Sequence, residues 1–342
     1  MPTIYAHAAG DYLTMLQDAG LTIVESAAQA QYAACIWQWL IRDVATLCAP
    51  YGNLNVNVDA LDKQVLTNTF AALGYEVIPH IPLTSRQIID TVPWVPLFSK
   101  PSWSTARLSP SPFDYVTYNS KEAAYAAFDA DTSNTLGTRN AILQPSYAVN
   151  GRTDLLIISA SVNGAGVIAM EPVLVLVQKE NYGHFYSAVR GGSDNLPNVE
   201  MCKEATRRFI QTSGIRNTHI KIQFISNGTT YLPMDLGYSF DYISMYVIPK
   251  LGINSTYHLD RIRFAYDMTP TPPVFNDVTS LRLINIRPEV DNVQVQAAMQ
   301  THNIKFLNAN GFDRYRMFGN VGQSKDAVMA SMDAFEMEIG NV

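Results

Sequence analysis

The chain has 342 residues, of which 47% are hydrophobic and 16% are charged, so it can bury a sizeable core and a disordered chain is excluded. Its 24 lysines and arginines stand against 30 aspartates and glutamates, and no basic run is longer than two residues. The resulting net charge of −6 argues against nucleic acid or an anionic membrane as a partner.

The N-terminal residues and the cysteines favour a cytoplasmic protein. Residues 1–3 show no positively charged start of a signal peptide, and no apolar run reaches membrane-spanning length. The three cysteines, Cys35, Cys48 and Cys202, are odd in number and show no CxxC spacing. We therefore expect reduced, structural thiols rather than a zinc site.

The first fifty residues have the pattern of a small parallel sheet. Short strands are predicted at residues 4–6 and 21–24, with a helix after Asp11 between them and a second helix over residues 27–47. Strands that alternate with helices in this way are typical of an α/β domain.

Residues 61–83 predict an amphipathic helix that ends at Gly74 and leads into a short strand. Val65, Phe70 and Leu73 share its apolar face, which we expect to point inward. Lys63 stands at the start of this helix, where it is either a solvated surface lysine or a ligand for an anion.

The next segment, residues 92–108, predicts a buried strand that ends at Lys100 and is followed by a loop. A lysine at the end of such a strand points its ammonium group into a cleft, where it can neutralise phosphate charge. The alternative is a lysine at an ordinary strand edge. Ser104 lies in the loop, and its hydroxyl can donate to a phosphate.

Residues 141–169 read as three strands joined by turns at residues 150–151 and 163–164, after a helix at residues 121–128. An apolar strand at residues 173–177 precedes a long predicted loop over residues 182–200, which contains Arg190.

Residues 220–242 combine a strand pattern with metal-ligand chemistry. Alternating apolar residues and the turn at residues 227–228 predict an antiparallel hairpin. Gln223 and Asp235 stand on its two arms, so they can lie side by side on one face. Oxygen ligands in this arrangement can hold Mg²⁺ together with substrate phosphates. The alternative is an ordinary surface hairpin.

The remaining residues predict a strand at 281–287, a helix at 290–300 and a closing helix capped by Ser324. Ala327, Met329 and Met332 are expected to pack inward from the closing helix.

In this order, the segments resemble the ATP-grasp superfamily, in particular its biotin-carboxylase-like branch of carboxylate–amine and carboxylate–thiol ligases. The resemblance rests on the Asp-Lys start of the helix at residues 61–83, on the strand that ends in Lys-Pro at residues 100–101, and on the hairpin with Gln223 and Asp235. It covers nearly the whole chain.

The resemblance implies an α/β and α+β fold in which two subdomains clasp ATP. Residues 1–90 would form an N-terminal parallel α/β domain with a linker helix, and residues 91–150 the small subdomain. Residues 151–270 would form the large subdomain with the metal-binding hairpin, and residues 271–342 a C-terminal extension.

The resemblance also implies a reaction in which ATP and Mg²⁺ activate a carboxylate as an acyl phosphate, which an amine or similar nucleophile then attacks. Both substrates would be small molecules. The residues at matching positions are Lys63 and Lys100 for the phosphates, Gln144 and Tyr147 for adenine, Arg190 as the catalytic residue at the transferring phosphoryl group, and Gln223 and Asp235 for Mg²⁺. Asp154 lies one residue after the position of the ribose-binding acid, and Ser104 offers a hydroxyl to the phosphates in the loop where glycines are usual.

The sequence departs from the family pattern at three places. Gly237 and Ser239 stand where a metal-binding Asn and an Arg are usual, and the loop after Lys100 lacks the usual glycines. Two alternatives therefore stay open: an ATP-grasp-like protein that binds nucleotide or has a structural role without catalysis, and an unrelated α/β binding module. A homodimer is compatible with the sequence, which carries no signal for the oligomeric state.

Overall fold

The structure is a computed structural model of the whole chain. The residues that it describes are 3–7, 22–25, 29, 32–35, 59–102, 113, 115–130, 141–162, 166–179, 186–216, 218–238, 266–267, 274–275, 278–304, 306–308 and 315–340.

The described N-terminal strands form a parallel sheet, as the sequence predicts. Strand β1 (Thr3–His7) lies between β2 (Thr22–Val24) and β3 (Tyr32–Cys35). The helix predicted over residues 27–47 is wrong at β3, because a short apolar run fits a buried strand as well as a helix. The other residues of that predicted helix, Gln29 excepted, and the helix predicted after Asp11 lie outside the described residues.

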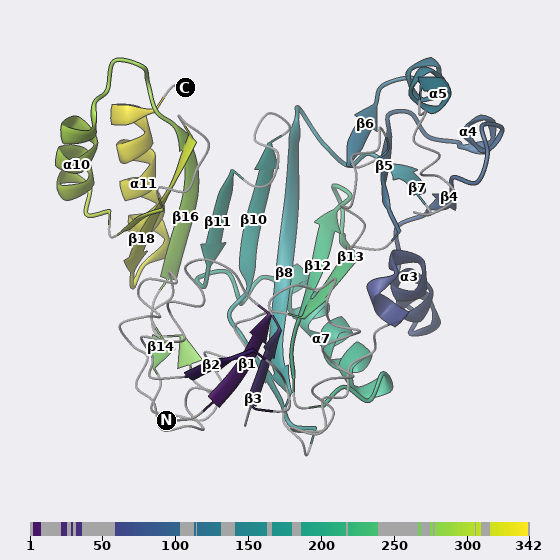
Figure 1. The fold of residues 1–342 in the computed structure, drawn as a ribbon, viewed down its shortest axis with the longest axis horizontal. Coiled ribbons are helices and arrows are strands. Elements are labelled where there is room, and N and C mark those ends of the chain that lie inside the picture. The colour runs from purple at the N-terminus through teal and green to yellow at the C-terminus, as the bar shows by residue number, and fades with distance from the viewer. Residues whose placement is uncertain are drawn as a thin grey trace.

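A large antiparallel sheet forms the centre of the molecule (Figure 1). Among the described residues it has nine strands, and its C-terminal strands continue the sheet formed by residues 152–238. In spatial order these are β13 (Tyr231–Tyr238), β12 (Thr218–Ser226), β8 (Arg152–Val162), β10 (Leu174–Lys179), β11 (Ser187–Arg190), β16 (Val278–Asn285), β18 (Tyr315–Gly322) and β17 (Phe306–Asn308), with β9 (Ile168–Met170) beside β8.

The prediction of a long loop over residues 182–200 is wrong at two places, whereas residues 191–196 between them lie in no helix or strand, as predicted. Strand β11 lies inside it, between β10 and β16, and a helix begins at Pro197. The four residues of β11 are too few for an alternating pattern to stand out in the sequence. Long-range pairing with β10 and β16 therefore decides that this segment is a strand.

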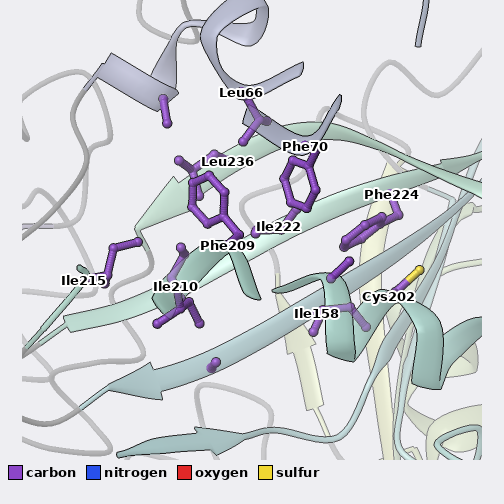
Figure 2. Close-up of a cluster of buried hydrophobic side chains, with 14 of the residues drawn as sticks. Leu66, Phe70, Ile158, Cys202, Phe209, Ile210, Ile215, Ile222, Phe224 and Leu236 are labelled. Carbon is purple, nitrogen blue, oxygen red and sulfur yellow. The ribbon is translucent and has the colours of Figure 1, made fainter. Parts of the chain in front are cut away.

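Two helices cover one face of the hairpin end of the sheet, α3 (Lys63–Ala72) and α7 (Pro197–Thr212). Figure 2 shows their side chains converging with those of β8, β12 and β13. Phe70 of α3 stacks on Phe209 of α7 with ring centroids 5.2 Å apart. Because each fully buried Phe contributes about 1.5–3 kcal/mol, this contact anchors α3 to the sheet.

The predicted inward face of α3 is partly wrong. Phe70 is fully buried and Leu73 packs against the core, but Val65 is exposed. Leu66 and Phe70, four residues apart, form the buried stripe instead. Cys202 of α7 is a free buried cysteine in the same core, and burial raises the pKa of its thiol to about 12.

A second antiparallel sheet has four strands in the described part of the chain. It carries helices on one face, and Figure 1 shows it above α3. Its elements are β4 (Ile81–Pro82), β7 (Ala141–Pro145), β5 (Leu97–Pro101) and β6 (Val116–Tyr118), with α4 (Ile88–Thr91) and α5 (Lys121–Ala130).

The C-terminal helices α10 (Asn292–Thr301) and α11 (Lys325–Ile339) pack on β16 and β18. Ser324 caps α11 as predicted, with its Oγ accepting from the Ala327 amide. Met332 is buried as predicted and Met329 is partly buried, but Ala327 is exposed and Val328 takes the inward position. The remaining short elements are a 3₁₀ turn, η4 (Asp59–Leu61), and the paired strands β14 (Tyr266–Asp267) and β15 (Val274–Phe275).

Candidate functional site

Three segments that are far apart in the sequence meet where α3, the small sheet and the β12–β13 hairpin come together (Figure 1). Lys63 begins α3, Lys100 lies near the end of β5, and Asp235 lies on β13. The Lys63 Nζ is 3.8 Å from Oδ1 of Asp235. Both lysines are only 3% exposed. The structure therefore places two buried ammonium groups around one carboxylate.

The hairpin brings Gln223 and Asp235 side by side. The two residues are direct partners in the antiparallel register of β12 and β13. Asn227 accepts hydrogen bonds from the amides of Thr229 and Thr230, which stabilises the turn, and the register shifts between Gln223 and Phe224, on the way from the turn to this pair. Opposed residues of such strands have Cβ atoms about 4.5–5.5 Å apart and project from the same face. The predicted pair of oxygen ligands is thus adjacent.

Lys63 reaches Asp235 because α3 begins beside the edge of the large sheet. Strand β13 is the outermost strand on this side, and α3 packs against it. Asp62 caps the helix, with Oδ1 accepting from the amides of Gln64 at 2.8 Å and Val65 at 3.3 Å. The cap fixes the first turn of α3, and with it the position of Lys63.

Lys100 projects from the face of the small sheet that is opposite to its helices. Leu97 and Leu143 pack with α4 and α5 on one face. Side chains alternate along a strand, so Lys100 lies on the other face. Gln144 is on that same face, because it pairs with Phe98, two residues before Lys100. Gln144 is also buried. Two of the predicted nucleotide-binding residues therefore share one face.

The surroundings of Lys100 disfavour its charged form. The pKa of Lys100 is lowered to about 7, mainly by burial and in addition by the nearby Lys63 ammonium, while Asp235 opposes the shift. Burial is the main cause of the lowered pKa of His80, which also lies close enough to Lys100 and Asp62 to feel their charges. A bound anion beside Lys63 and Lys100 would favour both ammonium groups.

The ligand set at the hairpin fits a metal only in part. Within the described ranges, no three or more His, Cys, Asp and Glu side chains gather closely enough to bind a metal by themselves. Asp235 offers one carboxylate and Gln223 one amide oxygen. Mg²⁺ is commonly held by one or two carboxylates together with substrate phosphates, so this pair suits a metal that arrives with a nucleotide.

Tyr147 lies on the same face of the large sheet as the hairpin ligands. It packs with Ile78, Leu155 and Leu176 in an apolar cluster on the face away from α3 and α7. Burial raises the pKa of its phenol, so the hydroxyl stays protonated at neutral pH. Tyr147 thus adds an aromatic side chain to the surface that bears Gln223 and Asp235.

Arg190 lies on this face as well, at a distance from the hairpin. The register runs from Gln223 across two strands to Arg190, through the partners Ile157 and Leu174. Three strand spacings amount to about 14 Å. The Arg190 Nη1 donates to Oε2 of Glu171 at 2.6 Å, and both side chains are at most 4% exposed.

The structure does not bring Asp154 together with these residues. On β8, Leu155 and Ile157 face the cluster that contains Tyr147, so Asp154 projects from the opposite face. Its carboxylate is 44% exposed and pairs with the Arg152 guanidinium at 2.8 Å. Ser104 and Ser239 lie outside the described residues.

The sequence analysis assigned no role in the site to three residues that the structure places here, namely Asp62, Ser102 and Glu171. Ser102 donates from Oγ to Oδ2 of Asp62 at 2.7 Å, which ties β5 to α3. The Asp-Lys pattern at residues 62–63 was a usable signal for Asp62. The serine gave no comparable signal, and neither did Glu171, because their partners are 40 and 19 residues away.

Comparison by sequence finds no protein-family model that matches the chain and no curated protein that matches it.

No helix in the described part of the chain is long and apolar enough to cross a membrane.

Comparison by structure finds proteins that match the chain over almost its whole length. The N5-carboxyaminoimidazole synthetase of Staphylococcus aureus matches with a TM-score of 0.67 at 10% identity, over 98% of this chain and 97% of that one. The L-amino acid ligase of Bacillus licheniformis matches with a TM-score of 0.67 at 8% identity, over 99% and 98%. A carboxyaminoimidazole ribonucleotide synthase of Aspergillus clavatus, complexed with ATP, matches with a TM-score of 0.60 at 9% identity, over 98% and 99%.

Proposed function

The chain has the ATP-grasp fold, and from this premise we propose that it is an ATP-dependent carboxylate–amine ligase. ATP and Mg²⁺ would bind between the small sheet and the β12–β13 hairpin. The solved structures that match it include a synthetase, a synthase in complex with ATP and an amino acid ligase. The proposal rests on the residues of the candidate site as well as on this likeness in fold.

The observation that carries the proposal is the meeting of Lys63 and Lys100 around Asp235. Two buried ammonium groups repel each other, and burial of each is costly without a compensating charge. A triphosphate would add negative charge beside both lysines, since its oxygens can approach both of them. The nucleotide would lie at the junction of the two sheets, with Gln144 of the small sheet on one side and the surface of the large sheet that bears Tyr147, Gln223 and Asp235 on the other.

The chain's side chains then have mainly positioning and electrostatic roles. Lys63 and Lys100 hold the phosphates, and Arg190 stabilises negative charge at the reacting end of the site. A carboxylate oxygen of the first substrate attacks the γ-phosphorus, the bond to the ADP oxygen breaks, and an acyl phosphate forms. An amine then attacks the acyl carbon, phosphate leaves with the bonding electrons, and the amine gives up a proton.

Gln223 and Asp235 would hold the metal together with the phosphates. When bound, Mg²⁺ neutralises charge on the phosphate oxygens and polarises the phosphorus that is attacked. Ser104 is proposed to donate to the same phosphates, whereas Asp154 lies on the other face of β8 and is given no role in binding the nucleotide.

A second candidate is a protein that binds nucleotide without turnover. Gly237 lies directly opposite Lys221 in the hairpin, at the place where the family pattern has a metal-binding Asn. Glycine offers no side-chain ligand, so the metal would have one ligand fewer. ATP binding without release of ADP would favour this candidate.

Thermal unfolding with and without ATP and Mg²⁺ tests the proposal. A ligand at one hundred times its dissociation constant stabilises a protein by about 2.7 kcal/mol, which raises the melting temperature measurably. We expect this rise in the wild type and its loss in Lys100→Ala. ADP release with panels of carboxylates and amines would then identify the substrates.

Lys121→Ala is the matched control. The Lys121 Nζ donates to the Asp90 carbonyl at 2.8 Å, on the helix-bearing side of the same sheet. This variant should keep the full nucleotide-induced rise. A wild type that shows no rise with any nucleotide, with or without metal, would overturn the proposed function.

A further inference from the structure

The start of α3 and the end of β5 are joined by two reciprocal hydrogen bonds. The Lys63 amide donates to the Ser102 carbonyl at 3.0 Å, and the Ser102 Oγ donates to Oδ2 of Asp62 at 2.7 Å. Ser102 is 1% exposed, so water does not compete for its hydroxyl. A buried hydroxyl that donates to a carboxylate makes a short, charge-assisted bond, which is stronger than a neutral one.

Asp62 uses its two carboxylate oxygens for two different tasks. Oδ1 caps the helix through the amides of Gln64 and Val65, while Oδ2 accepts from Ser102, forty residues further along the chain. Asp291, which caps α10, forms a capping box with Gln294 within its own first turn. A local cap is thus enough to begin a helix in this protein. The bond to Ser102 needs another explanation.

The two hydrogen bonds act next to the two buried lysines. Lys63 directly follows Asp62, and Lys100 of β5 precedes Ser102, the residue after the strand, by two residues. The Lys63 ammonium disfavours the charged form of Lys100, and like charges repel, so the two side chains would move apart if their backbones were free to do so. The contact between residues 62–63 and Ser102 holds the backbones at a constant separation.

We propose that Asp62 and Ser102 form a positioning pair that holds Lys63 and Lys100 close enough for both to bind one polyphosphate chain. The pair touches neither the phosphates nor the reacting atoms, and it acts through the lysines. Its consequence for nucleotide affinity rests on the proposed function, whereas its effect on the lysines themselves does not.

Ser102→Ala and Asp62→Ser test the pair from its two sides. Alanine removes the donor and leaves the cap intact. Serine at position 62 is a good helix cap, but its single oxygen cannot serve both the helix and Ser102. We expect each variant to weaken ATP·Mg²⁺ binding about tenfold, as measured by calorimetry. The double variant should be no weaker than either single one, because both changes break the same contact.

Two control variants separate positioning from ordinary loss of a buried group. Ser99 is a fully buried serine of β5, three residues before Ser102, and Asp291 is a helix cap far from the site in the sequence. Ser99→Ala and Asp291→Ser should change ATP affinity by less than about twofold, even where they lower the melting temperature.

A second readout needs no nucleotide. Acylation of lysine amines followed by mass spectrometry reports how accessible Lys63 and Lys100 are. We expect both to react several-fold faster in Ser102→Ala and in Asp62→Ser than in the wild type or the controls. Unchanged reactivity in those two variants would overturn the proposal. Faster reactivity in a protein that binds no nucleotide would support the positioning pair and contradict the proposed function.

Discussion

The structure holds buried positive charge in two ways. Arg190 donates to Glu171 at 2.6 Å, and neither side chain is more than 4% exposed, so this charge is matched within the fold. Lys63 and Lys100 both lie near the carboxylate of Asp235. The Lys63 Nζ is 3.8 Å from Oδ1 of Asp235, whose side chain is 21% exposed. The first arrangement is typical of a contact that the folded chain completes by itself. The second is typical of a site that is completed by an anion.

The physical reason for the difference is geometry as much as charge. A guanidinium group forms short, directed hydrogen bonds to a carboxylate, while an ammonium group behaves as a compact point charge. At 3.8 Å the Lys63–Asp235 contact is longer than a hydrogen bond and leaves room for other oxygens. Changes in the two regions should therefore have opposite effects on stability.

Arg190→Met should give the largest change in stability. The substitution leaves the Glu171 carboxylate buried without the guanidinium that now faces it, which costs about 3–5 kcal/mol of the free energy of unfolding. Urea denaturation measures this loss. Adding Glu171→Leu to the variant should restore most of the lost stability, because the buried charge is then gone. A full loss that persists in the double variant would mean that packing rather than charge sets the cost.

Lys100→Met should act in the opposite direction. Replacing a buried ammonium group that faces Lys63 with an apolar side chain of similar length should stabilise the protein without nucleotide by about 2 kcal/mol at pH 7. The same variant should lose the nucleotide-induced rise in melting temperature. Lys121→Met is the control and should change neither quantity by much. A Lys100→Met protein that is less stable than the wild type would remove the contrast with Arg190.

The pH dependence of stability should reveal Lys100 directly. The pKa of Lys100 is about 7 in the folded protein against an ordinary value of 10.5, so the unfolded chain binds more protons between these two pH values. The free energy of unfolding therefore gains a contribution that rises with pH from about 7 to 10.5, by at most about 1.4 kcal/mol per pH unit. Lys100→Met lacks this contribution. Denaturation curves from pH 6.5 to 9.5 should thus show the variant's advantage shrinking as pH rises, and a constant advantage would contradict the lowered pKa.

Asp235→Asn should give the smallest change in stability. The carboxylate is partly exposed and its contact with Lys63 is long, so its loss should cost about 1 kcal/mol or less. Its effect should instead fall on the metal, because the hairpin then offers no carboxylate. We expect ATP affinity measured with Mg²⁺ to fall to the value measured without it. Asp154→Asn, on the other face of β8, is the control. An affinity that still depends on Mg²⁺ in Asp235→Asn would exclude this residue as the ligand.

Much of the site could be predicted because its signals are local. The alternation around Gln223 and the turn at residues 227–228 predicted the hairpin, and the register of β12 and β13 confirms that Gln223 and Asp235 are opposed. The burial of Lys100 near a strand end followed in the same way from the apolar residues before it. Such features depend on backbone preferences and side-chain periodicity over a few residues, which a sequence displays directly.

Other features depend on which elements meet, and the sequence alone left them open. Val65 is exposed because α3 turns Leu66 and Phe70 toward Phe209. Strand β11 exists because its neighbours β10 and β16 pair with it.

The sequence by itself therefore determined that residues 220–242 contain a hairpin and that Lys63 begins a helix and Lys100 lies near the end of a buried strand. Only the tertiary structure decided three contacts. Lys63 and Lys100 lie near Asp235, Arg190 forms an ion pair with Glu171, and Asp62 accepts a hydrogen bond from Ser102. The physical reason is that these contacts join residues 19 to about 170 positions apart, and their energies depend on distances and burial that arise only when the sheets and helices pack.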